Sequence, residues 1–121
     1  MRKITLHLII YIAALLCFSC TPKQKAESAV KDFLSNNLTK KDFSVISYGR
    51  LDSTRYITDG IVKELRLQAS KDKAFTITQE YAERDNPKQL IFLPVKIKQD
   101  NQEQDYTFYL TMDFEKVVCF K

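Results

Sequence analysis

The sequence predicts an α+β domain in which an N-terminal amphipathic helix packs on a curved antiparallel sheet of about four strands. Two observations support this fold class. Apolar residues recur at three-and-four spacing over residues 24–38, which is the spacing of one helical face. Apolar and polar residues alternate through most of the C-terminal half, as they do in half-buried strands. A helix and a sheet with these patterns bury each other's apolar faces in two layers.

The N-terminal half of the domain carries the helical signals. The first helix is predicted from apolar positions that share one face, namely Ala26, Ala29, Val30, Phe33, Leu34 and Leu38. A strand is expected over residues 43–51, with a bulge at Gly49, and a polar, turn-like stretch over residues 52–60. Residues 61–69 fit either a short second helix, capped by Asp59, or a strand, and we favour the helix.

The C-terminal half carries the strand signals. Three or four antiparallel strands are predicted there from alternation, at residues 75–81, 91–97, 106–112 and 117–120. Polar stretches at residues 85–88 and 100–104 are expected to form the turns between them. Pro94 lies inside the second of these strands and has no N–H to donate, so we expect an edge strand or a bulge at that point.

The first twenty residues have the pattern of an export signal. A basic start, Met1-Arg2-Lys3, precedes an apolar run over residues 8–18 and then Ser19-Cys20, the order found in secretory signals. The run is much shorter than the roughly 20 residues of a spanning helix, so we favour a cleaved signal over a retained membrane anchor. The expected organisation is a signal peptide over residues 1–19, a lipidated tether over 20–25 and a single domain over 26–121.

The end of this leader, Cys17-Phe18-Ser19-Cys20, resembles a bacterial lipobox, and the alternative is a plain cleaved signal that contains cysteines. The resemblance implies that the Cys20 thiol is diacylated and that this residue becomes the new N-terminus. Thr21 follows instead of Asp, which by the same resemblance implies the outer membrane. No acidic cluster comes after Cys20, which favours the periplasmic side of that membrane.

Loss of the leader removes most routes to catalysis. The one histidine, His7, lies within it, so the mature chain has no imidazole for a catalytic triad, a Cys-His site or a histidine-ligated zinc. The two glycines are too few for a phosphate-binding loop. The net charge of +4 falls further when Arg2 and Lys3 leave, so nucleic acid is not an expected partner. We expect no catalytic residues, no metal site and no cofactor.

Cys119 is the cysteine that remains free once Cys17 is removed and Cys20 is lipidated. It lies in the apolar stretch 117–120, and free cysteine packs like a small hydrophobic side chain. We therefore expect a buried core thiol instead of a reactive thiolate, which needs a cationic neighbour to lower its pKa.

Two residues stand out as candidate modification or contact sites. Asp52-Ser53-Thr54 resembles the O-glycosylation sequon of exported proteins in some gut anaerobes, which implies a glycan on Ser53, and the alternative is an ordinary Asx or Ser turn. Tyr109 falls on the polar face of its predicted strand. It is the candidate contact with a partner, and the alternative is an exposed tyrosine with no role.

Two sets of acidic residues resemble a calcium site and a catalytic carboxylate pair, but structural roles explain both sets better. The run 100–105 lacks the glycine and the terminal glutamate of a calcium loop, so we interpret it as a solvated hairpin tip. Glu80, Glu83 and Asp85 are candidates for paired carboxylates of glycoside chemistry. Charged strand edges that discourage aggregation are the preferred interpretation of these three residues.

The lipobox, the helix face Ala26-x-x-Ala29-Val30-x-x-Phe33-Leu34 and the strand-rich C-terminal half together resemble the small cystatin-like or NTF2-like bacterial lipoproteins. The resemblance implies the fold. Our hypothesis is a lipid-anchored, non-catalytic periplasmic module that binds or assembles a protein or another envelope component at its sheet face. The alternative is a small inhibitor or immunity lipoprotein that blocks an enzyme or toxin through loops 52–60 and 113–116. A third hypothesis is an enzyme that uses tyrosine, lysine or carboxylates.

Overall fold

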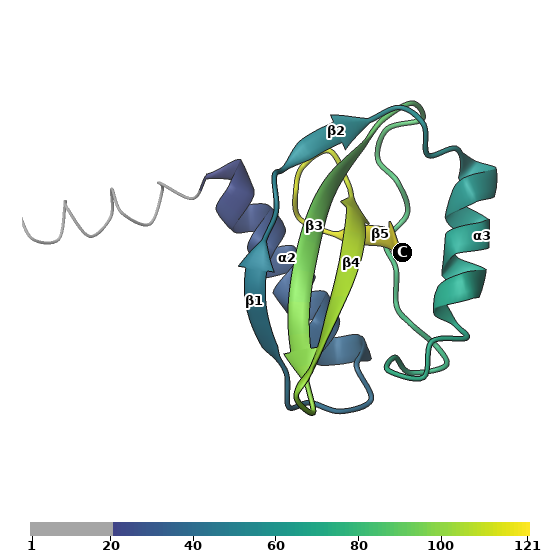
Figure 1. Ribbon diagram of the computed structural model, residues 1–121. Coiled ribbons are helices and arrows are strands. Elements are labelled where there is room, and N and C mark those ends of the chain that lie inside the picture. The colour runs from purple at the N-terminus through teal and green to yellow at the C-terminus, as the bar shows by residue number, and fades with distance from the viewer. Residues whose placement is uncertain (1–20) are drawn as a thin grey trace, which may run out of the picture.

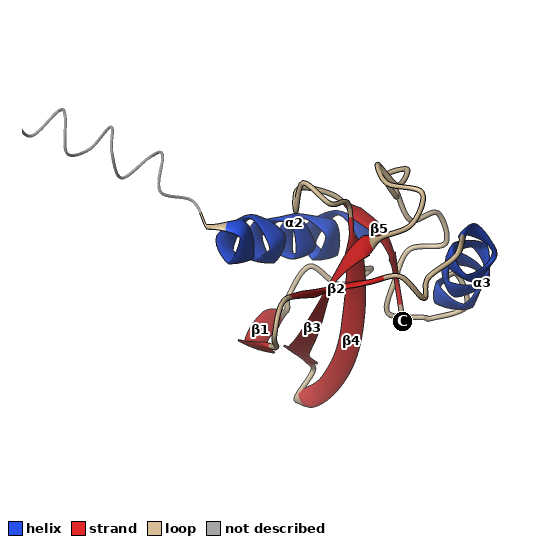
Figure 2. Ribbon diagram, turned by 90° about the horizontal axis from the view of Figure 1, so that it is seen from above, coloured by secondary structure: helices blue, strands red, loops and turns tan. Residues whose placement is uncertain are grey.

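The structure is a computed structural model that describes residues 21–121. The proposed signal peptide, His7, Cys17 and Cys20 lie outside the described residues. In chain order the described elements are α2 (Pro22–Asn37), β1 (Ser44–Tyr48), β2 (Asp52–Thr54), α3 (Asp59–Ala69), β3 (Leu90–Gln99), β4 (Gln102–Leu110) and β5 (Val117–Phe120). Together they form an open antiparallel sheet with a helix on each side (Figures 1 and 2). The α+β class is confirmed. Neither of these helices has the length and hydropathy to cross a bilayer.

Helix α2 begins at Pro22, directly after its cap residue Thr21, because the local sequence favours the start of a helix there. The Thr21 hydroxyl accepts a hydrogen bond from the Gln24 N–H at 3.2 Å, and the Gln24 side chain accepts one from the Thr21 N–H at 3.1 Å. This reciprocal capping box is reinforced by Pro22 in the first turn, where the fixed φ of proline suits a helix. The predicted tether over residues 20–25 is therefore wrong from residue 22 onward, since those residues are helical.

One face of α2 packs against one face of the sheet, here called the inner face. Val30 and Leu34 are fully buried in a single cluster with Leu93 of β3 and Phe108 of β4. Phe33 lies at the centre of an aromatic group, with ring centroids 5.9 Å from Phe108 and 5.7 Å from Phe120. Such edge-to-face pairs add to the hydrophobic stabilisation.

Helix α3 covers part of the opposite face, here called the outer face. Its cap is Thr58, whose side chain accepts from the Ile61 N–H at 3.3 Å. Val62 and Leu65 are buried against Leu90, Tyr109, Val118 and Cys119 in a second apolar cluster. The preference for helix over strand at residues 61–69 is confirmed.

The sheet has the order β1-β3-β4-β5, and β2 pairs with the same side of β3 as β1 does. β3 is thus a central strand, so the expectation of an edge strand at Pro94 is wrong. Pro94 is accommodated because β1 ends at Tyr48, opposite Val95, and β2 begins at Asp52, opposite Phe92. The missing N–H faces the break between those two strands.

Two further predictions about strands are wrong. Residues 75–81 contain no strand beyond an isolated bridge from Phe75 to Leu38. Hydrogen bonds to Asn37 hold this segment in place of a partner strand. The Asn37 carbonyl accepts from the Thr76 N–H at 2.8 Å, and the Asn37 side chain accepts from the Glu80 N–H at 2.9 Å. The turn-like stretch 52–60 contains strand β2 and the start of α3.

The hairpin loop predicted over residues 100–104 is shorter in the structure. It consists of Asp100 and Asn101, whose φ angles of 50° and 63° fit a tight two-residue turn.

Gly49 lies at the break between β1 and β2, where its N–H donates to the Pro94 carbonyl at 2.7 Å. A Cβ at this position would lie 2.8 Å from Pro94 Cβ and 3.0 Å from its Cγ. We expect Gly49→Ala to lower the free energy of unfolding by about 1–3 kcal/mol, because a rigid ring on a central strand cannot move aside. Denaturant unfolding followed by circular dichroism measures this change.

The matched control is Gly60→Ala in the first turn of α3, where the nearest atom to an added Cβ is Thr58 Oγ1 at 3.9 Å. Alanine is the better helix former by up to about 1 kcal/mol, so this variant should be at least as stable as the parent. Equal stability of the two variants would contradict the packing described at Gly49.

Candidate functional site

The outer face changes character halfway along the strands. Phe92, Tyr109 and Cys119 lie opposite one another on β3, β4 and β5 and share the apolar cluster under α3. The rows nearer the β3–β4 hairpin are mostly polar, and no helix of residues 21–121 lies over them. Six residues make up this part of the face, which we call the bare half-face: Ser47, Pro94, Lys96, Asp105, Thr107 and Lys121.

Strand pairing brings the residues of the bare half-face together. Lys96 lies opposite both Ser47 and Asp105, and Thr107 lies opposite Pro94. Thr107 and Lys121 exchange two backbone hydrogen bonds, of 2.9 and 3.0 Å. These residues line a shallow hollow of about 450 Å³.

The charges of the bare half-face are mixed, and one edge beside it is open. Lys96 Nζ lies 4.0 Å from Asp105 Oδ1, a separation at which an exposed ion pair contributes little to stability, so both groups remain free to contact another molecule. Within residues 21–121, β1 pairs with β3 along one edge, and no strand pairs with its other edge. Ile46 on that strand is 44% exposed. The surface offers hydrogen bonds, both signs of charge and an open strand edge, which suit contact with a polar macromolecular surface.

Tyr109 does not belong to this surface, and the prediction that it faces a partner is wrong. Its side chain is 5% exposed because α3 packs over the part of the outer face where it lies. Its neighbours in the same row, Phe92 and Cys119, are both apolar. Thr107, two residues earlier on the same face of β4, is half-buried and lies beyond the part of the face that α3 covers.

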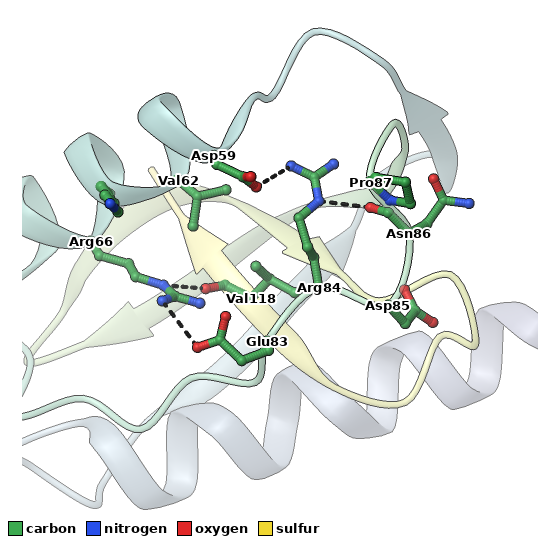
Figure 3. Close-up of a pocket in the computed structure, with 10 residues that line it drawn as sticks. Asp59, Val62, Arg66, Glu83, Arg84, Asp85, Asn86, Pro87 and Val118 are labelled. Carbon is green, nitrogen blue, oxygen red and sulfur yellow. Dashed lines mark hydrogen bonds and ion pairs between the residues drawn. The ribbon is translucent and has the colours of Figure 1, made fainter.

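A second hollow, of about 480 Å³, separates α3 from the segment 83–87 (Figure 3). Arg66 reaches across it from α3. Its Nε donates to the Val118 carbonyl at 2.9 Å and its Nη2 to the Ala82 carbonyl at 3.0 Å. Its guanidinium also lies 5.0 Å from the ring centroid of Tyr81, within cation–π range. Arg66 therefore joins α3 to β5 and to the segment that passes beside it.

Arg84 makes the corresponding connection from the other wall. Its Nε donates to the Asn86 carbonyl at 2.7 Å, and its Nη1 donates to the Ile57 carbonyl at 2.9 Å and lies 3.2 Å from Asp59 Oδ1. Its Nη2 is buried and has no hydrogen-bond partner. Both arginines thus use donors to bind backbone carbonyls and hold the fold, so we interpret this hollow as a structural seam between α3 and the segment 83–87.

The three carboxylates considered for glycoside chemistry have separate roles. Glu83 is 93% exposed and lies 3.9 Å from Arg66 Nη1. Asp85 accepts a hydrogen bond from the Met112 N–H at 2.8 Å, which ties the segment to the β4–β5 turn. Glu80 is held by its backbone, through Asn37. All three carboxylates are exposed to solvent.

Cys119 is fully buried and has no disulfide partner among the described residues, as the sequence predicts. Burial raises the pKa of its thiol to about 11, against the lowering effect of Arg66 and Arg84. Tyr106 is similar, because burial and the nearby Asp72 carboxylate raise its pKa to about 12. Both groups are protonated at neutral pH, which removes them as nucleophiles.

Ser53 is exposed, but on strand β2 instead of in the predicted loop. It pairs with Ile91 of β3, and its N–H donates to its neighbour Asp52 at 2.8 Å. A broad, open hollow of about 710 Å³ lies alongside β2, and the 85% exposed side chain of Tyr56 lines it. Glycosylation of Ser53 stays a prediction.

The acidic run 100–105 is a turn only at Asp100 and Asn101, and its other residues belong to β4. Asp100 forms an ion pair with Lys40, which joins the tip to the loop after α2. Within residues 21–121 no three histidine, cysteine or acidic side chains gather closely enough to hold a metal ion.

Comparison with known proteins gives no guide to these surfaces. No family model matches the chain, and neither a curated protein nor a solved structure matches it. The function is therefore argued from the residues themselves.

The structural role of Arg66 is testable by Arg66→Lys. A lysine keeps the positive charge but cannot reach both the Val118 and Ala82 carbonyls with a planar fork. We expect the free energy of unfolding to fall by roughly 1–3 kcal/mol, since a buried acceptor loses its donor. The control is Lys63→Gln on the exposed side of the same helix, which should change stability by less than about 0.5 kcal/mol. The same small effect from both substitutions would show that Arg66 does not hold α3 in place.

Cys119 gives a prediction about alkaline pH. The unfolded thiol releases its proton near pH 9.0, whereas the folded chain retains it until about pH 11. The stabilisation from the buried thiol is therefore complete below pH 9 and is lost as the pH rises through 11. Denaturant unfolding between pH 8 and 11 should show a steeper loss of stability in the parent protein than in Cys119→Ala. Parallel pH profiles for the two proteins would contradict this burial.

Proposed function

We propose that this protein is a lipid-anchored, non-catalytic binding or assembly module of the bacterial cell envelope, attached to the periplasmic side of the outer membrane. The observation that carries the proposal is the bare half-face. A sheet face that is covered by a helix at one end and left open at the other presents a shallow surface with charged and hydroxyl side chains next to an open strand edge. Its mixed charges and backbone groups fit a protein or another envelope component as partner.

The chemistry of the remaining side chains also supports a binding role. The Cys119 thiol and the Tyr106 hydroxyl are held protonated. The guanidinium groups of Arg66 and Arg84 bind backbone carbonyls. These four side chains are thus committed to the fold, whereas Lys96, Asp105 and Thr107 of the bare half-face are accessible to a partner.

Lipid anchoring is supported by the residues that precede the described part of the chain. Cys17-Phe18-Ser19-Cys20 follows a basic start and an apolar run, and Cys20 is the position that a lipobox would modify. Two or three acyl chains at this residue would hold the protein on a membrane stably, because each buried methylene contributes about 0.8 kcal/mol.

We also propose that the chain belongs with the small cystatin-like or NTF2-like lipoproteins. The support is an N-terminal helix whose apolar face packs on an open antiparallel sheet. This proposal concerns the fold and carries no catalytic residues with it.

One observation favours the alternative of an inhibitor or immunity protein. The connection from β2 to α3 over residues 55–58 places Tyr56 almost fully in solvent. An exposed tyrosine on a short loop is a typical anchor for contact with another protein. In this alternative the toxin or enzyme meets Tyr56 instead of the bare half-face.

The two candidates are separated by site-specific photo-crosslinking in intact cells of the native host. A photoreactive phenylalanine analogue replaces Thr107 in one variant, Tyr56 in a second and the exposed Lys31 of α2 in a control. We expect a crosslinked product of one defined mass from position 107, none from position 31, and at least a several-fold loss of the product when Lys96→Glu is added.

A product from position 56 alone, with none from 107, would transfer the binding role to the β2–α3 connection and support the inhibitor. Equal products from all three positions would mean that the bare half-face is not the contact surface.

A further inference from the structure

We propose that α2 stands as a rigid post on the membrane, with its first turn at the phospholipid head groups and the β3–β4 hairpin end of the domain held away from the lipid. The inference rests on the proposed lipidation of Cys20. It goes further in assigning one orientation to the domain, and a membrane lipid surface as the contact of one named end of the fold.

The first argument is the length of chain between the lipid and the fold. Cys20 and Thr21 are consecutive, so their Cα atoms lie about 3.8 Å apart. Thr21 is already the cap of α2 and is tied to Gln24 by two hydrogen bonds. No flexible residues separate the acylated position from the helix. A lipoprotein with a long linker samples many orientations, whereas here the lipid is attached to the end of a helix.

The second argument is that α2 cannot swing independently of the domain. Ala26, Val30 and Leu34 along its length are fully buried against the sheet. At its C-terminal end the Asn37 amide donates to the Phe33 carbonyl at 2.8 Å and accepts from the Glu80 N–H at 2.9 Å. The orientation of the helix is therefore the orientation of the whole domain.

The third argument is electrostatic. The first turn of α2 contains no acidic residue, although acidic side chains are usually favourable there because they offset the partial positive charge of a helix N-terminus. The turn carries Lys23 instead, and Lys25 follows. Lysines near a bilayer are attracted to anionic lipids by roughly 1 kcal/mol each, so an anionic phospholipid surface supplies the negative charge that the sequence omits.

The orientation decides which surfaces a partner can reach. The turn between β4 and β5 follows the end of β4 that lies away from the β3–β4 hairpin, so it lies at the end of the sheet where α2 begins (Figure 1). The opposite end of the domain holds the β3–β4 hairpin (Figure 1), where Asp100 forms an ion pair with Lys40. A helix of this length spans about 24 Å. In the proposed orientation the hairpin end therefore lies about that far from the lipid head groups.

The test measures distance from the membrane at three positions on the exposed side of α2. Lys23→Cys, Ser28→Cys and Asn36→Cys are made singly, and all three positions are exposed. Because Cys119 is buried, a fluorophore labels the introduced thiol. The acylated protein is purified from membranes and reconstituted into vesicles of phosphatidylcholine and phosphatidylglycerol that contain a quencher attached to the lipid head group. Circular dichroism checks that each labelled variant is folded.

We expect quenching to decrease in the order 23, 28, 36, with at least a threefold difference between the two ends. Insertion of a 12-residue Gly-Ser linker between Cys20 and Thr21 should abolish that gradient while leaving the protein on the vesicles. Equal quenching at the three positions in the parent chain would mean that α2 lies flat or tumbles, and would overturn the inference.

Failure of the proposed function is recognised separately. Intact-mass measurement of the purified protein reports whether residue 20 carries acyl chains. A chain without lipid that does not associate with vesicles would refute the anchoring itself. An acylated, vesicle-bound chain without a gradient would refute the orientation alone.

Discussion

The architecture depends on how far α3 extends over the outer face of the sheet. The helix packs over the row formed by Phe92, Tyr109 and Cys119, and the β3–β4 hairpin continues beyond it. Where both faces are covered, outward residues are apolar and reactive groups are buried. Where one face is covered, the strands return to the alternation of a half-solvated sheet. The burial of Tyr109, the inertness of the Cys119 thiol and the existence of the bare half-face all follow from the position of this boundary.

The position of α3 is itself fixed by polar contacts as well as by apolar burial. Arg66 binds carbonyls of the edge strand β5 and of the segment beside it, and Arg84 binds carbonyls of two loops. These charge-assisted bonds satisfy backbone acceptors of those segments. The segment after α3 thereby lies along β5, where the Ala82 N–H donates to the Val117 carbonyl at 2.9 Å. One edge of the sheet is covered in this way, and the edge formed by β1 remains open.

Periodicity within one segment identified both helices and the strands β3, β4 and β5, because each of them has a strong repeat of its own. The errors arose where the outcome depends on a distant neighbour. Residues 75–81 alternate like a strand but are held by Asn37. Tyr109 shares a face of its predicted strand with Thr107 and Thr111 and so resembles an outward polar residue, until its neighbours across the sheet are considered. Comparing Phe92 with Cys119 in the predicted pairing would have indicated a covered row. The arginines of the seam gave no local signal, since their partners are main-chain carbonyls far along the sequence.

The boundary on the outer face can be measured directly by nuclear magnetic resonance of the Cys20→Ser variant in the presence of a soluble gadolinium chelate. Such a reagent broadens signals according to their distance from solvent. The account predicts strong broadening of the Thr107 and Lys96 side chains and weak broadening of the Phe92 and Tyr109 rings, although all four share one face of the same two strands. Broadening of the Tyr109 ring as strong as that of Thr107 would show that α3 does not cover this face, and the bare half-face would lose its definition.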